Sequence, residues 1–143
     1  MRPVTILLLT TVFAAAASVA AAIVASGMAH PIPILGTFAS LTLSKNPGIA
    51  FSLPIPSPWK EIVILIALAA ILWIAFQSRR DKFLSVAFGL IIGGAIGNLL
   101  DRIADGYVTD YFAVGRFPIF NVADSCITIG AVLVILLSLR KKD

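Results

Sequence analysis

Two carboxylates, Asp110 and Asp124, are the side chains in this sequence best placed to do chemistry. Asp110 precedes the last long apolar run, and Asp124 lies within its first turns. An acidic residue near hydrocarbon is costly to ionise and marks a functional site by default. Two carboxylates that share a site do not both ionise easily, so one keeps its proton. Such a pair can activate a water as general base and protonate a leaving amine as general acid, which is peptide hydrolysis by an aspartic mechanism.

The composition indicates an integral membrane protein. The 143 residues are 59% hydrophobic and 13% charged, with a mean hydropathy of +1.03, which excludes an ordinary soluble domain. A bilayer span needs about 20 apolar residues, and four runs approach this length, at about residues 3–27, 62–76, 83–100 and 119–139. We find no repeat or linker and expect one domain over residues 1–143. No basic, aromatic-rich run of the kind that binds nucleic acid is present.

The first apolar run leaves two alternatives, a retained membrane helix or a cleaved signal. Arg2 ahead of the run and the small residues Ala20, Ala21 and Ala22 are typical of a secretory signal. However, the run is longer than the roughly 7–15 apolar residues of a signal core. Its length favours a retained helix.

The connection after the first run predicts short strands. Its prolines exclude a long helix; they are Pro31, Pro33, Pro47, Pro54, Pro56 and Pro58. The segments at residues 34–43 and 48–53 mix β-branched, aromatic and small residues, and the turn Asn46-Pro47-Gly48 separates them. The segment that carries Asp110, YVTDYF, also has an extended pattern.

The third run and the basic residues predict how the spans pack and how they are oriented. Gly89, Gly93 and Gly97 recur every fourth residue, which gives one smooth helix face for close packing. With four spans, seven basic residues fall on one side of the membrane and four on the other. The positive-inside rule then places both termini in the cytoplasm, and the two carboxylates at the outer face.

Polar residues accompany Asp124 along the fourth run. Asn121, Asp124 and Thr128 are three and four residues apart and so share one helix face. The helix dipole favours negative charge at Asp124, near the N-terminus of this helix.

The remaining polar residues have simpler interpretations. We interpret Asp101 with Arg102 as a structural pair, Asp105 as a solvated loop residue, and Cys126 as a packing residue facing away from Asp124. The single histidine, His30, has no second imidazole or thiol beside it, so no metal site and no cofactor are expected.

Four ordered blocks, NPGIAF, GGAIGNLLDR, GYVTDY and FPIFNVADS, resemble lipoprotein signal peptidase, the bacterial type II signal peptidase. The resemblance extends from about residue 32 to the C-terminus. It implies an aspartic endopeptidase of the bacterial inner membrane, with its active site at the extracytoplasmic face. The implied reaction removes signal peptides from diacylglyceryl-modified prolipoproteins and cuts before the lipid-bearing cysteine. The implied fold is all-α, with four transmembrane helices and a small extracytoplasmic β-cradle between helices 1 and 2.

The resemblance also assigns residues and partners. Catalytic roles fall on Asp110, in VTD where the family usually reads VVDF, and on Asp124, in NVAD. Supporting or substrate-binding roles fall on Asn46, Asn98, Arg102 and Asn121. The expected partners are the prolipoprotein substrate and membrane lipids, and we expect a monomer.

The first run departs from the family pattern. The family usually carries Asp-Gln with a following Lys there, whereas this chain reads TTVFAAAASVAAA. Two other functions therefore stay open, a catalytically weakened lipoprotein-binding relative and a small proton-coupled carrier. A carrier would more naturally place acids at mid-membrane in several helices, so the Asp pair with its Asn and Arg neighbours favours the enzyme.

Overall fold

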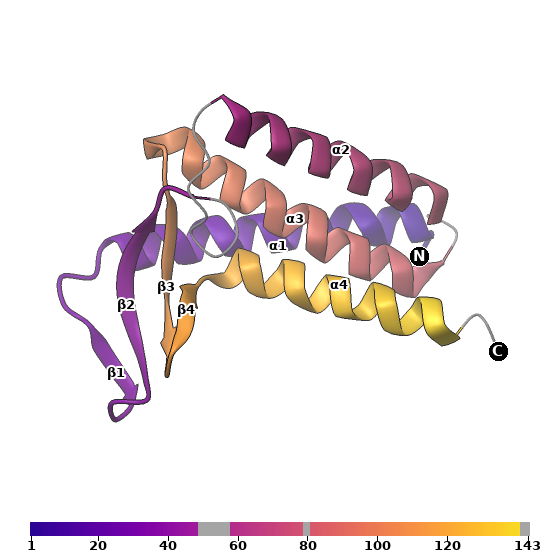
Figure 1. Cartoon of the computed structure of the whole chain (residues 1–143). Helices are drawn as coiled ribbons and strands as arrows, with labels where there is room; N and C mark the ends of the chain where they lie inside the picture. The colour runs from indigo at the N-terminus through magenta and orange to yellow at the C-terminus, as the bar shows by residue number, and fades with distance from the viewer. Residues whose placement is uncertain (49–57, 79–80, 141–143) are drawn as a thin grey trace.

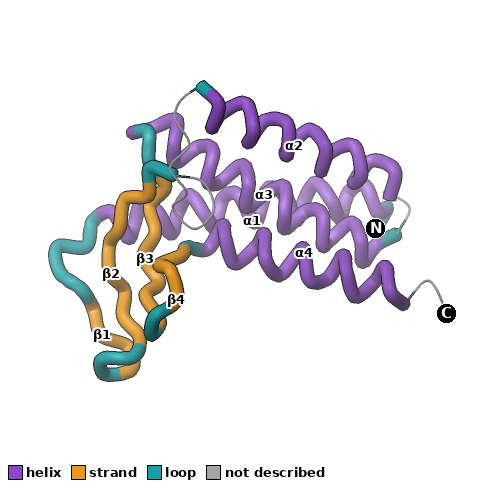
Figure 2. The backbone as a smooth tube through the Cα atoms, viewed as in Figure 1, coloured by secondary structure: helices purple, strands orange, loops and turns teal. Residues whose placement is uncertain are grey.

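The computed structural model describes residues 1–48, 58–78 and 81–140. Within these residues, four helices lie side by side and a small sheet lies at one end of them (Figures 1 and 2). The helices are α1 (Pro3–Ser26), α2 (Trp59–Ser78), α3 (Lys82–Asp105) and α4 (Val122–Arg140). The strands are β1 (Ile32–Leu35), β2 (Ala39–Asn46), β3 (Val108–Val114) and β4 (Phe117–Phe120). This arrangement confirms the predicted fold class.

The length and apolar character of the helices are those of a multi-pass membrane protein. Among the described residues, α1, α3 and α4 are long and apolar enough to cross a membrane, with mean hydropathies of 2.3, 2.0 and 2.3. Helix α2 has 20 residues, and its apolar part, Ile62–Gln77, is shorter. Its apolar face still packs on α3, where Ala75 joins the buried core around Phe88.

Helix α3 is the centre of the bundle because its glycines let two other helices approach closely. A Cβ added at Gly93 would lie 2.5 Å from the Thr11 carbonyl oxygen and 2.6 Å from Ala14 Cβ, both on α1. On the side of α3 that faces α4, a Cβ at Gly94 would lie 2.5 Å from the Ala123 carbonyl oxygen. The glycine face predicted from the sequence therefore packs against α1.

We expect Gly93→Ala to destabilise the protein, because the new methyl group would overlap the backbone of α1. Overpacking of this kind costs about 1–3 kcal/mol, so the thermal unfolding temperature in detergent should fall clearly. Gly27→Ala is the matched control, since its Cβ would meet only the Val24 carbonyl oxygen at 3.4 Å, an ordinary contact. Equal unfolding temperatures for the two variants would contradict this account of the α1–α3 interface.

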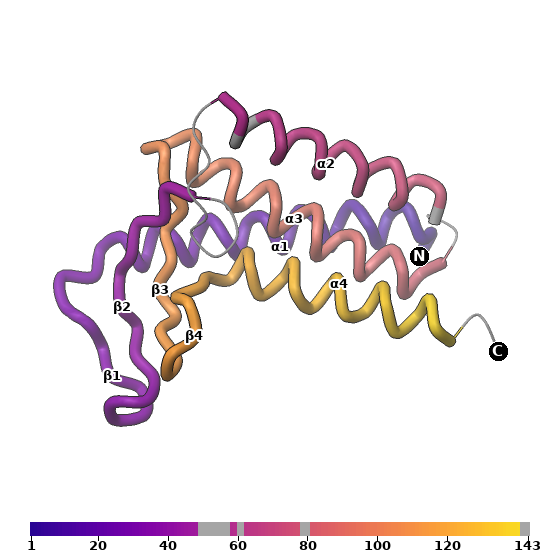
Figure 3. The backbone as a smooth tube through the Cα atoms, in the orientation of Figure 1, coloured from indigo at the N-terminus to yellow at the C-terminus, as the bar shows by residue number. Residues whose placement is uncertain are grey.

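The sheet joins two segments that are far apart in the sequence. Its order is β1-β2-β3-β4, and every pair is antiparallel. Strands β1 and β2 belong to the α1–α2 connection, whereas β3 and β4 belong to the α3–α4 connection (Figure 3). The β2–β3 pairing places Asn46 opposite Val108 and Ser44 opposite Asp110. Side chains alternate along a strand, so Asn46 and Asp110 lie on the same face of the sheet.

Some predicted boundaries were wrong. A turn at Gly36, whose φ is +54°, divides the predicted strand at residues 34–43 into β1 and β2. The predicted segment at residues 48–53 lies almost wholly outside the described residues. The fourth helix begins at Val122, later than predicted, because residues 117–120 pair with β3 as strand β4.

Candidate active site

Asp110 lies on β3 and is only 3% exposed. Its two carboxylate oxygens each accept a hydrogen bond from an amide side chain. Asn46 Nδ2 donates to Oδ2 at 3.0 Å, and Asn121 Nδ2 donates to Oδ1 at 2.8 Å. Buried carboxylates need such partners, and these two come from strand β2 and from the start of helix α4.

Asp124 is held by the cap of helix α4. Asn121 precedes the helix and accepts a hydrogen bond from the Asp124 backbone N–H through Oδ1, at 2.8 Å. In return, Asp124 Oδ2 accepts from the Asn121 backbone N–H at 3.4 Å. This reciprocal pair has the geometry of a capping box, so the same residues that start the helix fix the direction of the Asp124 side chain.

Asn98 of α3 links the two carboxylates. Its Nδ2 donates to Asp124 Oδ1 at 2.9 Å, and its Oδ1 accepts from Asn121 Nδ2 at 3.1 Å. Asn121 Nδ2 also donates to Asp110, as described above. The chain Asp110–Asn121–Asn98–Asp124 therefore joins both acids through two side-chain amides, one from α3 and one from the start of α4.

Both carboxylates line one large groove between the helices. The groove has a volume of about 800 Å³, and its walls come from α2, α3, α4 and β4. Residues such as Leu68 and Ile71 of α2 and Ile91 of α3 make most of it apolar. The acids thus stand at the polar end of an otherwise hydrocarbon-like cavity.

The environment of Asp110 favours its protonated form. The pKa of Asp110 is raised to about 6, mainly by burial and also by the neighbouring negative charge of Asp124. The hydrogen bonds from Asn46 and Asn121 and the charge of Arg102 act in the opposite direction. The result is a carboxyl group that can hold a proton at mildly acidic pH beside a second carboxylate.

Arg102 supports the turn that follows β2. Its Nη2 donates to the Gly48 carbonyl oxygen at 2.7 Å, while the Gly48 N–H donates to Asn46 Oδ1 at 2.9 Å. The predicted turn at Asn46-Pro47-Gly48 therefore exists as an Asx turn. Among the four predicted supporting residues, Asn46, Asn98 and Asn121 donate to the carboxylates, and Arg102 lines the same groove.

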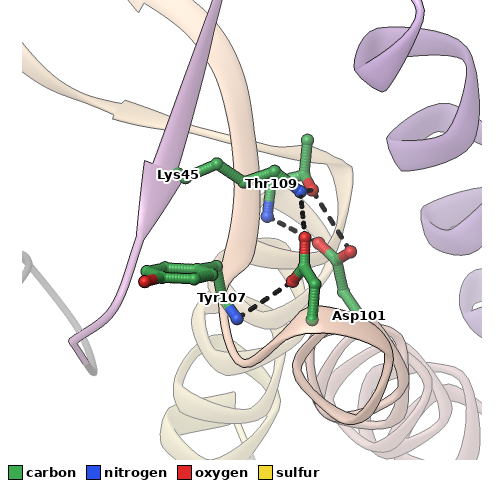
Figure 4. A network of polar contacts seen from close by, with 5 residues as sticks. Lys45, Asp101, Tyr107 and Thr109 are labelled. Atoms are coloured by element: carbon green, nitrogen blue, oxygen red, sulfur yellow. Dashed lines mark hydrogen bonds and ion pairs between the residues drawn. The ribbon is translucent and has the colours of Figure 1, made fainter.

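A second polar network lies beside the dyad at the end of α3. Figure 4 shows Lys45, Asp101, Tyr107 and Thr109 meeting there. The Thr109 N–H and hydroxyl both donate to the Asp101 carboxylate, and Lys45 Nζ donates to Thr109 Oγ1 at 2.9 Å. Asp101 therefore bonds to β3, a contact that the sequence did not indicate.

Asp105 is not a loop residue, because α3 extends to it. It accepts from Lys45 Nζ at 2.7 Å and from the Tyr107 N–H at 3.1 Å. Its side chain is 43% exposed. A solvated location was predicted correctly, whereas the ion pair with a residue 60 positions earlier has no local signal in the sequence.

Sequence reasoning missed the hydroxyl groups next to Asp110. Tyr111 is buried, and its hydroxyl accepts a hydrogen bond from the Val122 N–H, the first residue of α4, at 3.2 Å. Thr109 is fully buried. The pattern YVTDYF showed that hydroxyl residues flank Asp110, but the partners come from helices that only the fold brings close.

The other polar residues behave more simply. Thr128 lines the groove together with Asp124, as their shared face predicted, whereas Cys126 is not among the residues that line it. His30 is exposed. Across the part of the chain that the structure describes, no three His, Cys, Asp or Glu side chains gather into a group that could hold a metal ion.

Helix α1 contributes a small buried serine to its contact with α3. Ser18 is buried, and its hydroxyl donates to the Ala14 carbonyl oxygen at 2.7 Å. A Cβ at Gly97 would lie 2.6 Å from Ser18 Cβ. Helix α1 therefore meets α3 through small side chains at this level.

Comparisons with known proteins show which family this chain resembles. A sequence model of the signal peptidase (SPase) II family matches residues 6–140. The chain is 43% identical over 123 residues to a lipoprotein signal peptidase of Polynucleobacter necessarius subsp. necessarius, covering 80% of this chain and 75% of the relative. It is 37% identical over 118 residues to that of Rhodococcus jostii, covering 77% of this chain and 59% of the relative. The chain thus spans less than two thirds of the length of the latter relative.

Two solved structures, both described as bacterial membrane enzymes, have the same fold. One superposes with a TM-score of 0.86 at 27% identity, covering 96% of this chain and 89% of the other. The second gives a TM-score of 0.75 at 29% identity, covering 96% and 92%. With the family match over nearly the whole sequence, these findings confirm the resemblance seen in the four sequence blocks, and the chain belongs to the signal peptidase II family of aspartic proteases.

Proposed function

We propose that this chain is a membrane endopeptidase that removes signal peptides from diacylglyceryl-modified prolipoproteins, cutting before the lipid-bearing cysteine. One observation carries the proposal: two carboxylates, joined by the amides of Asn98 and Asn121, open into a mainly apolar groove of about 800 Å³. Relatives named lipoprotein signal peptidase support the substrate class.

The dyad performs hydrolysis with one proton held between its two acids. Asp124, ionised, takes a proton from a water while the water oxygen attacks the peptide carbonyl carbon. Asp110, protonated, gives its proton to the carbonyl oxygen as the tetrahedral intermediate forms. The intermediate then collapses, its hydroxyl proton returns to Asp110, the C–N bond breaks, and the amine leaves with the proton held by Asp124.

The groove suits a substrate that is itself part of the membrane. Its apolar walls can take up the apolar signal segment and acyl chains without stranding polar groups in hydrocarbon. Asn46, at the polar end, can offer its amide to the substrate backbone, which also needs partners there. We propose that membrane lipids surround the helices, and that the chain is a single domain that needs no cofactor. We also propose that it acts as a monomer, because one copy supplies all six site residues.

We place the protein in the bacterial inner membrane with its site at the extracytoplasmic face. The two termini lie at the end of the bundle opposite the sheet (Figure 1). Arg2, Lys82 and Arg140 lie at that end, next to the start of α1, at the start of α3 and at the end of α4. Four more basic residues adjoin them in the sequence, which makes seven of the 11. By the positive-inside rule this end is cytoplasmic. A reporter fused to the C-terminus should therefore stay in the cytoplasm, and its export would contradict the orientation.

The reaction is tested with purified protein and a prolipoprotein that carries the diacylglyceryl cysteine. We expect a gel shift to the mature size, and no shift for the same precursor without the lipid. An intact lipidated precursor after incubation with correctly folded protein would contradict the proposed function.

The pH dependence of kcat/KM should follow Asp110. Because the mechanism needs Asp110 protonated, activity is present below its pKa and is lost as the pH rises through about 6. The charged groups that face Asp110 are Asp124 of α4 and Arg102 of α3.

Asn46→Ala removes a hydrogen-bond donor that favours the ionised form of Asp110, so the alkaline limb of the pH profile should move to higher pH. Turnover should also fall by about tenfold, because Asp110 loses a positioning partner.

Thr42→Val, in the same strand, is the control for Asn46→Ala. Its hydroxyl contacts Ser40 and not the dyad. An alkaline limb that stays in place in Asn46→Ala would show that the Asn46 amide does not set the protonation of Asp110.

A further inference from the structure

Two buried hydroxyl groups flank Asp110 on strand β3. The Thr109 side chain is 0% exposed, and that of Tyr111 is 4% exposed. Because side chains alternate along a strand, both point to the face opposite Asp110. The dyad chemistry described above uses neither hydroxyl.

Each hydroxyl group bonds to a different helix. The Thr109 hydroxyl donates to Asp101 Oδ1 on α3 at 3.2 Å, and the Thr109 backbone N–H donates to the other oxygen of the same carboxylate. The Tyr111 hydroxyl accepts from the Val122 N–H at the start of α4, at 3.2 Å. Strand β3 is thus bonded to one helix just before Asp110 and to another just after it.

The two helix residues to which β3 is bonded lie within one helical turn of the site residues on the same helices. Asp101 follows Asn98 by three residues on α3, and Val122 precedes Asp124 by two residues on α4. A helical turn has 3.6 residues, so a shift of β3 against α3 or α4 would move Asp110 relative to Asn98 or relative to Asn121 and Asp124.

We infer that Thr109 and Tyr111 are positioning residues for cleavage, which hold Asp110 at its working distance from Asn98 and Asp124 by bonding β3 to α3 and α4. This inference rests on the proposed function. Removal of the two hydroxyl groups should lower kcat and not raise KM, because they face away from the groove and do not contact the substrate. A displacement of about 1 Å in a catalytic group can lower the rate by about 100-fold.

The test removes each hydroxyl with little change of volume. Thr109→Val, Tyr111→Phe and the double variant are compared with the wild type for kcat and KM on the lipidated precursor. We expect the double variant to lose about tenfold or more in kcat with KM within about twofold, and each single variant to lose part of this. Thr109→Ser, which keeps the hydroxyl, should restore most of the rate.

Ser40→Ala is the matched control. It removes a hydroxyl from the same sheet, where Ser40 bonds Thr42 and pairs with Ala113, three residues beyond Asp110. It should leave kcat unchanged.

A double variant with the kcat of the wild type would overturn the inference, and so would a Thr109→Ser variant as slow as Thr109→Val. If the double variant does not accumulate in the membrane, the single variants decide by the same two criteria. Wild-type protein and Asp124→Asn are measured in the same series. Absence of cleavage by the wild type would refute the proposed function, whereas normal cleavage by the double variant would refute only the positioning role.

Discussion

Asp110→Asn and Asp124→Asn should each abolish cleavage while the protein still inserts and still binds the lipidated precursor. Asparagine preserves the size and much of the hydrogen bonding of aspartate, but its amide cannot take a proton from water and return it. We expect losses of at least about 1,000-fold in kcat for each variant, measured on the purified proteins.

The two losses should not add. Residues that act as one catalytic unit fail together, so the double variant should be about as slow as either single variant. Asp105→Asn is the control: its carboxylate is exposed and paired with Lys45, and such surface pairs contribute about 0–1 kcal/mol. Substantial cleavage by Asp124→Asn would contradict the aspartic mechanism.

The second large effect is expected at Asn121, which joins the helix cap to both acids. Asn121→Ala removes the cap of α4, which costs about 0.5–2 kcal/mol of stability. It also removes the donor to Asp110 and to Asn98. We expect cleavage to fall by about 100-fold, because both carboxylates lose part of the framework that places them.

Asn121→Ser separates the two roles of this side chain. Serine is a good helix cap, but it cannot donate to Asp110 and Asn98 at once. The thermal unfolding temperature should therefore return toward that of the wild type while cleavage stays low. Full recovery of cleavage in Asn121→Ser would show that Asn121 acts only as a cap.

Much of the fold could be predicted because its causes are local. The length of the apolar runs predicted the four helices, and the repeat of Gly89, Gly93 and Gly97 predicted the face that packs on α1. The start of α4 could not be placed correctly, since residues 117–120 continue the apolar character of the helix. Their pairing with β3 decides that they form a strand.

The candidate site, like the fold, could be predicted only in part. Asp110 and Asp124 stood out because charge is rare in this chain, and the resemblance supplied the four supporting residues. The bond between Asp101 and Thr109 and the bond between Tyr111 and Val122 could not be predicted. Each depends on how strand β3 lies against a helix, which residue types and spacing do not encode.

The most direct test of the dyad is mass spectrometry of the products formed by the wild type and by the Asp110→Asn/Asp124→Asn double variant. The substrate is one diacylglyceryl-modified prolipoprotein. We expect the wild type to yield a mature chain whose first residue is the lipid-bearing cysteine, and the double variant to leave the precursor intact. The same product from the double variant, or a cut at another bond by the wild type, would contradict this expectation.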